Sequence, residues 1–436
     1  MRRKMFCFAF FSMFIAMMLT SCRQSLDGIG LLYIPEGTTH GYISINHILH
    51  MNDHLYGRVP FSYRELEAAE WIAEQLVAMG HDCNAVVIQD FHIDDVEKHL
   101  WQSRVFLEAL GHFGNQEFCI DNVTALLTEQ TLSWWEGSEL EMEEFLNNQL
   151  DSIKAGSFGL FHDNMTFRES SQNVILTVPG QSERKIIVGA HYNSMIYPGA
   201  SDNASGTALL LESAHRILFL DNYYTIVYVF FGAEELGGFL GANYYIESLT
   251  QEQRNNIIFM INADILFEGP YFFFGAAHYD GYDTTAENSI TQQIEEIAYN
   301  LNATHSTELI NLPSLPWMMT DSRVFIEGYH TVVNLAGYAR LIEVDLDNFL
   351  FTVADVEHIE TNGDWPAFPV VRIDGDLFGG RLVHSPMRGD FFGGRIMHSP
   401  KDDIHFINEH WPEKVGEAMR AFSLFLEAML MAIYPY

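Results

Sequence analysis

Side chains that can bind metal ions or move protons follow three apolar runs of this sequence. His191 comes directly after "KIIVGA", Glu234 and Glu235 directly after "TIVYVFFGA", and Asp264 directly after "NIIFMINA". Asp202 lies between the first two runs, in "GASDNASG". If the runs are strands of an open α/β sheet, these residues fall at its carboxyl edge, where such sheets bind ligands. The spacing therefore predicts a site at that edge.

Each of these residues taken alone has an ordinary explanation. A histidine at a strand end is usually hydrogen bonded, and an acid there often caps the following helix. Several carboxylates in one crevice, however, repel one another and raise each other's pKa values unless a cation neutralises them. Imidazole and carboxylate ligands together suit zinc. The combination therefore predicts a zinc site.

The apolar runs also predict the fold. Near-continuous β-branched and aromatic runs are typical of central strands in a parallel or mixed sheet that is covered on both faces. We expect strands at "NVILTV", "KIIVGA", "TIVYVFF", "NIIFMIN" and "TVVNLA". The predicted fold class is α/β, with a mixed, mostly parallel central sheet flanked by helices on both faces.

One helix is expected before these strands, in residues 62–80, "SYRELEAAEWIAEQLVAMG". Apolar residues recur there at helical spacing and Gly80 is a stop signal. The expected buried stripe consists of Leu66, Ala69, Ile72, Ala73, Leu76 and Val77.

Composition and charge limit the kinds of partner that this chain can bind. The 436 residues are 48% hydrophobic and carry a formal net charge of −35, and no Lys/Arg-rich run occurs after the first four residues. A large core is therefore expected, and a nucleic-acid partner is not. Of the cysteines, Cys83 and Cys119 could form a disulfide in an exported protein or be two buried free thiols.

The motifs around the site residues resemble, in order, those of the secreted co-catalytic zinc aminopeptidases, metallopeptidase family twenty-eight of clan MH. They are "VGAHYNS", "GASDNASG", "FFGAEELGGFLGANYY", "INADILFEG" and "HSPKDD". The likeness covers residues 40–95, 172–275, 313–337 and 395–436. It implies a zinc aminopeptidase fold, like that of the phosphorylase-hydrolases, with insertions near the active site at about 101–170 and 340–394.

The resemblance implies two zinc ions held by five ligands. His191 and Asp264 would bind one ion, Glu235 and His398 the other, and Asp202 would bridge them. His398 resembles the last ligand motif of the family, whereas His384, in a near-duplicate "FGGRLVHSP", is followed by Met387 and Arg388. A cation beside a metal site is disfavoured, so His398 is the expected ligand.

Glu234 matches the general base of the family, which takes a proton from the water that bridges the metals. The implied activity is therefore di-zinc aminopeptidase activity on peptides with a free N-terminus.

One position departs from the family pattern. Where the family usually has His-x-Asp, this chain has Asn193, so an amide replaces the carboxylate that supports the ligand His191. An amide accepts a hydrogen bond but adds no charge to the imidazole. Losses of this kind typically cost about 10–100-fold in metal affinity or activity, so we expect a weaker first zinc site.

The N-terminus predicts export. A basic start precedes an apolar stretch at residues 5–19, and "LTSC" resembles the lipobox of bacterial lipoproteins. Residues 1–21 would be a signal peptide, Cys22 would carry the lipid, 22–39 would be a tether and 40–436 the zinc peptidase domain. The alternative is an uncleaved membrane anchor. Both place the body in the bacterial cell envelope, outside the cytoplasm.

Two other functions stay open. Glutaminyl cyclases resemble these peptidases and use one zinc ion, so a single-zinc cyclase is the second enzymatic interpretation. The third is a lipoprotein that kept the fold for binding, with Asn193 as a mark of lost catalysis.

Overall fold

The computed structural model describes most of the predicted peptidase domain. The described residues are 39–92, 168–195, 197–235, 239–267, 271–278, 288–312, 320–328, 330–338, 341–345, 350–354, 402–410 and 413–433. The predicted signal, tether and lipidation site at Cys22, both His384 and His398, Cys119, and most of the two predicted insertions lie outside these residues.

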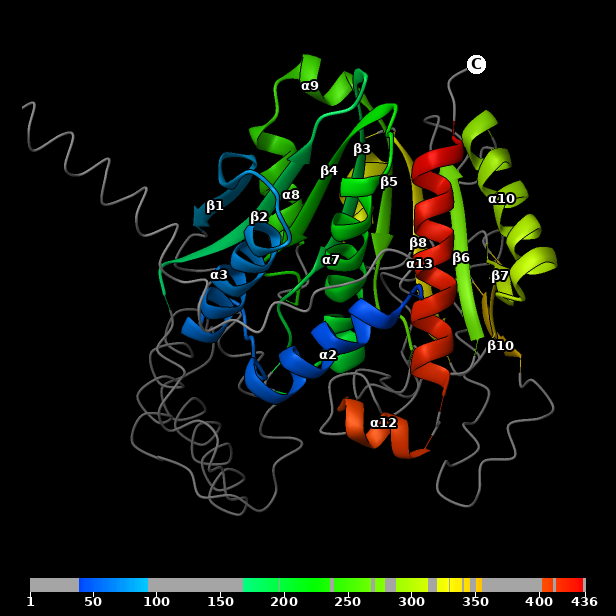
Figure 1. The fold of residues 1–436 in the computed structure, drawn as a ribbon, viewed down its shortest axis with the longest axis horizontal. Coiled ribbons are helices and arrows are strands. Elements are labelled where there is room, and N and C mark those ends of the chain that lie inside the picture. The colour runs from blue at the N-terminus through cyan, green and yellow to red at the C-terminus, as the bar shows by residue number, and fades with distance from the viewer. Residues whose placement is uncertain are drawn as a thin grey trace, which may run out of the picture.

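A mixed sheet forms the centre of the described chain (Figure 1). Its strand order is β1-β2-β4-β3-β5-β8-β6-β7. The four inner strands β4, β3, β5 and β8 are parallel, whereas β1, β2 and β6 pair antiparallel to their inner neighbours. The strands are β1 (Val86–His92), β2 (Ser170–Val178), β3 (Ser182–His191), β4 (Tyr224–Phe231), β5 (Ile257–Ala263), β6 (Tyr271–His278), β7 (Leu309–Asn311) and β8 (Thr331–Tyr338).

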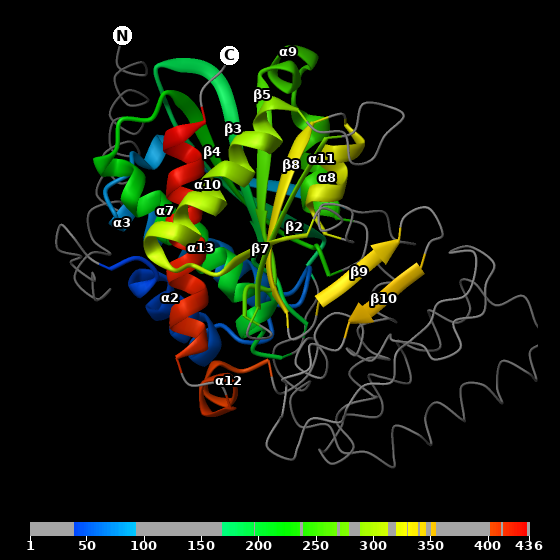
Figure 2. The same ribbon diagram turned by 90° about the vertical axis from the view of Figure 1, so that its right-hand side faces the viewer.

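All five predicted strands are present, as β2, β3, β4, β5 and β8. Every residue of β4 and β5 is buried, which explains their near-continuous apolar sequences. The sequence did not predict β1, because this edge strand is mostly exposed and its apolar run, residues 86–88, is short. Strands β9 (Leu341–Asp345) and β10 (Leu350–Ala354) form a separate antiparallel pair within the second predicted insertion (Figure 2).

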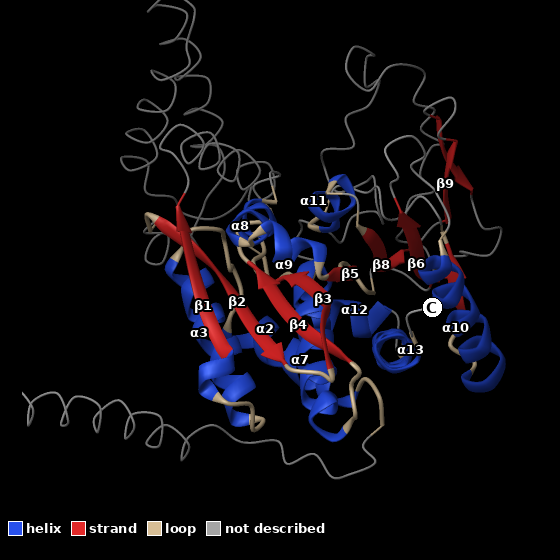
Figure 3. Ribbon diagram, turned by 90° about the horizontal axis from the view of Figure 1, so that it is seen from above, coloured by secondary structure: helices blue, strands red, loops and turns tan. Residues whose placement is uncertain are grey.

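Helices cover both faces of the sheet, so the predicted α/β class is confirmed (Figure 3). One face carries α2 (Tyr42–His54), α3 (Tyr63–Ala78), α7 (Gly206–Arg216), α10 (Ser289–His305) and α13 (Lys414–Ala432), and the other carries α8 (Leu240–Ser248) and α11 (Ser322–Glu327). The helices α9 (Gln251–Asn255) and α12 (Ile404–His410) are short. Each face has its own apolar core. Among the helices that the structure describes, none has the length and apolarity needed to cross a membrane.

Helix α3 confirms the predicted helix but buries a different stripe. Ser62 caps it by accepting a hydrogen bond from the Glu65 main-chain nitrogen, and Gly80 takes a φ of 114° after its end. Ala69, Ile72 and Leu76 are buried as expected, whereas Leu66, Ala73 and Val77 are only half-buried. The residues buried in their place are Glu65 and Ala68. The stripe is rotated because the carboxyl group of Glu65 points inward from the first turn.

The first predicted insertion leaves and re-enters the sheet at one point, because His92 pairs with Ser170 in the β1–β2 ladder. Its extent and structure stay a prediction. Cys83 is exposed, so the interpretation as two buried thiols is wrong for this residue.

Candidate metal centre

The parallel pairing of β4, β3 and β5 brings the predicted site residues to one edge of the sheet. His191 ends β3 opposite Phe231, the last residue of β4, so Glu234 and Glu235 follow within four residues of that point. Asp264 directly follows β5. Because all three strands run the same way, their carboxyl ends meet there.

Asp202 reaches the same place from the connection between β3 and α7. It lies in a short helical segment, η2 (Ala200–Ser205), that departs from regular helix geometry at Asp202 and Asn203 and has a cis peptide bond between them. Gly199 starts this segment with a φ of 59°. A side chain at Gly199 would meet the Asp202 carbonyl oxygen, so this position requires glycine.

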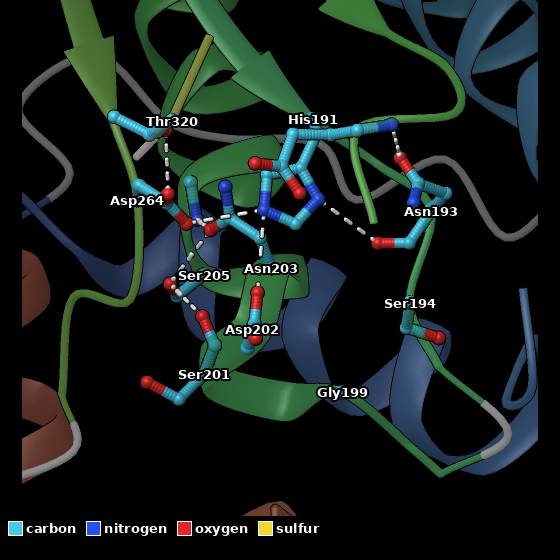
Figure 4. Close-up of polar contacts among 12 residues, drawn as sticks. His191, Asn193, Ser194, Gly199, Ser201, Asp202, Asn203, Ser205, Asp264 and Thr320 are labelled. Atoms are coloured by element: carbon cyan, nitrogen blue, oxygen red, sulfur yellow. Dashed lines mark hydrogen bonds and ion pairs between the residues drawn. The ribbon is translucent and has the colours of Figure 1, made fainter. Parts of the chain in front are cut away.

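His191 lies at the centre of the cluster (Figure 4). Its Nε2 atom is 3.1 Å from Asp264 Oδ1 and 3.2 Å from Asp202 Oδ1. One potential ligand atom each of His191, Asp202 and Glu235 lie within 4.8 Å of one another, and all three residues are buried. The structure thus brings together four of the five predicted ligands, and the fifth, His398, lies outside the described residues.

Buried acids dominate the electrostatics of this cluster. Burial opposes protonation of His191, but the carboxylates of Asp264 and Glu234 hold its pKa well above its usual range. Burial also raises the pKa of the Glu234 carboxyl well above its usual range, although His191 opposes this shift. A divalent cation would compensate such a concentration of acids, and an imidazole with several carboxylates is a donor set that zinc accepts. The residues present therefore fit a zinc site.

The support of His191 differs from the expectation. The main-chain carbonyl of Asn193, not its side chain, accepts the hydrogen bond from His191 Nδ1 at 3.2 Å. The Asn193 side-chain oxygen instead accepts from the main-chain nitrogen of Glu234 at 3.1 Å. The main-chain carbonyl of Asn193 therefore orients the ring, but it adds no charge to the imidazole, so the expected weaker first zinc site stays a prediction.

Thr320 is a contact that the sequence did not reveal. Its hydroxyl donates to Asp264 Oδ2 at 2.7 Å and accepts from Asn262 Nδ2 at 3.0 Å. Asp264 therefore has one oxygen beside His191 and the other fixed by a hydroxyl. Thr320 is 56 residues away in the chain, and no local spacing signals the contact.

Asp321 is a further acid that interacts electrostatically with the cluster. It is fully buried at the start of α11, and among the described residues neither of its carboxylate oxygens has a hydrogen-bond partner. Burial raises its pKa to about 8, against the opposing effect of His191 and with a further increase from Asp264 and Glu235. Asp321 thus adds to the acidity of the centre.

Asp402 connects the C-terminal segment to the cluster. Its two carboxylate oxygens accept the main-chain nitrogens of Ser201 at 2.6 Å and of Asp202 at 3.1 Å, and its carbonyl accepts from Ala200. Asp402 comes four residues after His398. This contact therefore anchors the chain that follows the predicted last ligand beside Asp202.

Arg58 fixes the loop between His191 and Asp202. Its guanidinium is fully buried and donates to the carbonyls of Tyr192 at 2.6 Å, Pro198 at 2.8 Å and Gly199 at 3.0 Å. Burial lowers the pKa of Arg58 to about 10, so the group stays charged at neutral pH.

Comparison with known protein families matches the model of peptidase family M28 to residues 173–423, which is more than half of the chain. The chain belongs to peptidase family M28. The family resemblance seen in the motifs is thereby confirmed. The matched region begins in β2 and ends in α13, so it includes every described residue of the metal cluster.

Curated relatives of this M28 chain are aminopeptidases. Aminopeptidase YwaD of Bacillus subtilis (strain 168) is 34% identical over 102 residues, which are 22% of this chain and 22% of the relative. A probable leucine aminopeptidase of Trichophyton verrucosum (strain HKI 0517) is 30% identical over 142 residues, 29% of this chain and 37% of the relative. The chain thus matches well under half of the length of each relative.

Solved structures agree with the M28 fold. A zinc aminopeptidase from Bacillus subtilis superimposes with a TM-score of 0.52 at 15% identity, covering 92% of this chain and 98% of that chain. The glutaminyl cyclase of Tannerella forsythia has a TM-score of 0.47 at 14% identity, covering 91% and 100%. The first likeness shows the fold, and the second favours neither reaction.

Proposed function

We propose that this M28 chain is a zinc-dependent aminopeptidase that releases N-terminal residues from peptides. The observation that carries the proposal is the cluster of His191, Asp202 and Glu235, with the buried Glu234 directly beside a potential ligand. Asp264, in contact with His191, supplies a fourth potential ligand. The aminopeptidase relatives support the same reaction.

Two zinc ions per chain are the proposed cofactor. From the family pattern, His191 and Asp264 would hold one ion, Glu235 and His398 would hold the other, and Asp202 would be shared. When bound, such a pair of ions lowers the pKa of water and polarises the substrate carbonyl. The hydroxyl of Thr320 and the carbonyl of Asn193 orient Asp264 and His191 for this task.

Glu234 is the proposed general base. It accepts a proton from the attacking water and delivers that proton to the leaving amine as the peptide C–N bond breaks. Its main chain is fixed by Asn193, so the carboxyl is held beside the cluster rather than in solvent. Excess buried acid favours binding of the protonated α-amino group of a peptide, which directs cleavage to the first residue.

Export and lipid attachment are proposed from the N-terminal sequence. Cleavage before Cys22 would leave the peptidase body on a lipid at the bacterial cell envelope, outside the cytoplasm. Replacement of Cys22 by serine should move the protein from the membrane fraction to the soluble fraction. Retention of the variant in membranes would support an uncleaved anchor instead.

The reaction is tested on the body lacking residues 1–22, reconstituted with zinc and incubated with three peptides of related sequence. The peptides carry a free N-terminal leucine, an acetylated leucine or a free glutamine. We expect release of the first residue from the free leucyl peptide only by zinc-loaded protein, with the acetylated peptide intact. Equal cleavage of the acetylated peptide would contradict the proposal. Cyclisation of the glutamine peptide without release of any residue would identify a cyclase, and no product from any peptide would favour the binding interpretation.

A further inference from the structure

The turn that carries Glu234 is held by side chains from three separate elements. After β4 ends, the consecutive main-chain nitrogens of Gly232, Ala233 and Glu234 have left the ladder of the sheet. Each donates to a side-chain oxygen, at 2.9–3.1 Å. The acceptors are Asn173 in β2, Glu65 in α3 and Asn193 after β3.

The middle residue of this turn adopts a backbone conformation that side chains rarely take. Ala233 has a φ of 55°, in the left-handed region, where a Cβ atom is strained. A strained residue persists only where its surroundings determine it, and such residues gather at functional sites. Here the main-chain nitrogen of Ala233 donates to Glu65 Oε1 at 2.9 Å. Glu234 follows directly, so the conformation of Ala233 sets the direction in which Glu234 leaves the turn.

Glu65 makes the same kind of contact with its second oxygen. Oε2 accepts from the main-chain nitrogen of Phe61 at 2.6 Å, and Phe61 also has a left-handed φ, of 63°. One fully buried carboxyl therefore fixes two left-handed residues that are far apart in the sequence. Capping of α3 alone would not require the contact with Ala233, because Ser62 already caps that helix.

We propose that Glu65 is a positioning residue for Glu234, which it directs toward the metal ligands by holding Ala233 in its left-handed conformation. This inference rests on the proposed role of Glu234 as the general base. It explains why an acid occupies the buried stripe of α3, where an apolar residue would otherwise pack. Asn193 and Asn173 secure the residues on either side of Ala233.

The test compares Glu65→Met and Glu65→Gln with Glu67→Gln, a control on the exposed face of the same helix. Methionine fills similar space but accepts no strong hydrogen bond, whereas glutamine keeps one oxygen acceptor. For E65M we expect kcat to fall about 10–100-fold, since small misplacement of a reacting group costs about this much. KM and zinc content should stay close to those of the wild type, E65Q should be intermediate, and E67Q should be unchanged.

A second measurement does not depend on catalysis. Hydrogen–deuterium exchange of the segment containing residues 232–235 is followed in zinc-free protein, and it should be faster in E65M than in the wild type and E67Q. Unchanged kcat together with unchanged exchange in E65M would overturn the inference, as would loss of zinc with no faster exchange. If E65M does not fold, E65Q decides the test. A kcat and an exchange rate in E65Q equal to those of the wild type would also overturn the inference.

The two proposals can fail separately. A wild-type protein that releases no amino acid refutes the proposed function, and faster exchange in E65M would still show that Glu65 holds the turn. An active wild type, with an E65M variant that is equally active and exchanges no faster, refutes only the role of Glu65.

Discussion

The loop after β3 and the turn after β4 both lead to metal-site residues, but a hydrogen-bond donor holds the loop and hydrogen-bond acceptors hold the turn. The loop from Tyr192 to Gly199 turns main-chain carbonyls inward, and the guanidinium of Arg58 donates to three of them. The turn from Gly232 to Glu234 turns main-chain nitrogens inward, and side-chain oxygens accept from them, including that of Glu65. Buried backbone groups need partners, so each segment is matched by a buried side chain of the opposite polarity.

Arg58 and Glu65 come from one short stretch, "RVPFSYRE", that precedes every predicted ligand in the chain. This stretch leads into α3 and packs beside both segments. A single structural element therefore positions both the ligand loop and the turn of the proposed base. We therefore expect substitutions of Arg58 to affect the loop after β3 and substitutions of Glu65 to affect the turn after β4, each without the other.

The largest effect is expected at the proposed base itself. Glu234→Gln keeps the shape of the side chain but cannot accept the proton, so kcat should fall about 10²–10⁴-fold. Zinc content should stay at the wild-type value, because Glu235 rather than Glu234 is the proposed ligand. Full activity of the variant at normal zinc content would remove Glu234 from the mechanism.

Substitution of Arg58, which holds the loop between His191 and Asp202, should mainly lower the free energy of unfolding. Arg58→Met leaves several buried carbonyls without their donor, at about 1–3 kcal/mol each before relaxation, so the free energy of unfolding should fall by about 3–5 kcal/mol. Arg58→Lys keeps the charge but not the fork of donors and should lose less. Urea unfolding of the zinc-free variants measures both. Equal stability of R58M and the wild type would show that the loop does not depend on Arg58.

Glu65, which holds the turn after β4, should make the folding stability depend on pH. Burial raises the pKa of Glu65 to about 8, although hydrogen bonds from Phe61 and Ala233 and the charge of Arg168 oppose the shift. The folded protein thus keeps a proton that the unfolded chain releases near pH 4.5, so folding stability falls as pH rises toward 8.

Because Glu65→Gln cannot titrate, the difference in unfolding free energy between wild type and E65Q isolates this group. From pH 5 to pH 8 the wild type should lose stability relative to E65Q, by up to about 1 kcal/mol per pH unit. Urea unfolding at intervals across this range measures the difference. Parallel curves for the two proteins would mean that Glu65 does not carry the shifted pKa.

The smallest effect is expected at Thr320. Its hydroxyl contacts the predicted ligand Asp264 but belongs to neither the loop after β3 nor the turn after β4. Thr320→Val removes the donor to Asp264 Oδ2 without changing the shape of the side chain, and zinc affinity should fall about 10-fold. Thr320→Ser keeps the hydroxyl and is the matched control. Competition with a coloured chelator gives both affinities, and equal values for T320V and T320S would exclude a role for the hydroxyl.

Much of the fold could be predicted because its inner strands are buried on both faces. Strands β4 and β5 have no exposed residue, so their sequences are almost continuously apolar and their carboxyl ends could be located to within a residue. The edge strand β1 carries exposed and buried residues without a clear pattern, and it was missed. Acids and the histidine at the strand ends were visible because chain order and parallel pairing together bring them to one edge.

The partners of these residues could not be predicted, because their contacts join distant parts of the chain. The Ser62-x-x-Glu65 spacing is typical of a local helix cap, yet the Glu65 side chain accepts from the main-chain nitrogens of Phe61 and of the distant Ala233 rather than from that of Ser62. Arg58 is charged and would be expected on the surface, and its burial depends on the inward carbonyls of a loop that begins more than 130 residues later. The family pattern could not show which atom of Asn193 faces His191, and the structure shows that it is the main-chain carbonyl.

The most direct test of the central proposal is zinc titration of the metal-free body, lacking residues 1–22, with release of leucine from a peptide as the readout. Two equivalents per chain should bind, and activity should rise until both are bound. Binding of a single equivalent, with no leucine released at any zinc level, would contradict a two-zinc aminopeptidase.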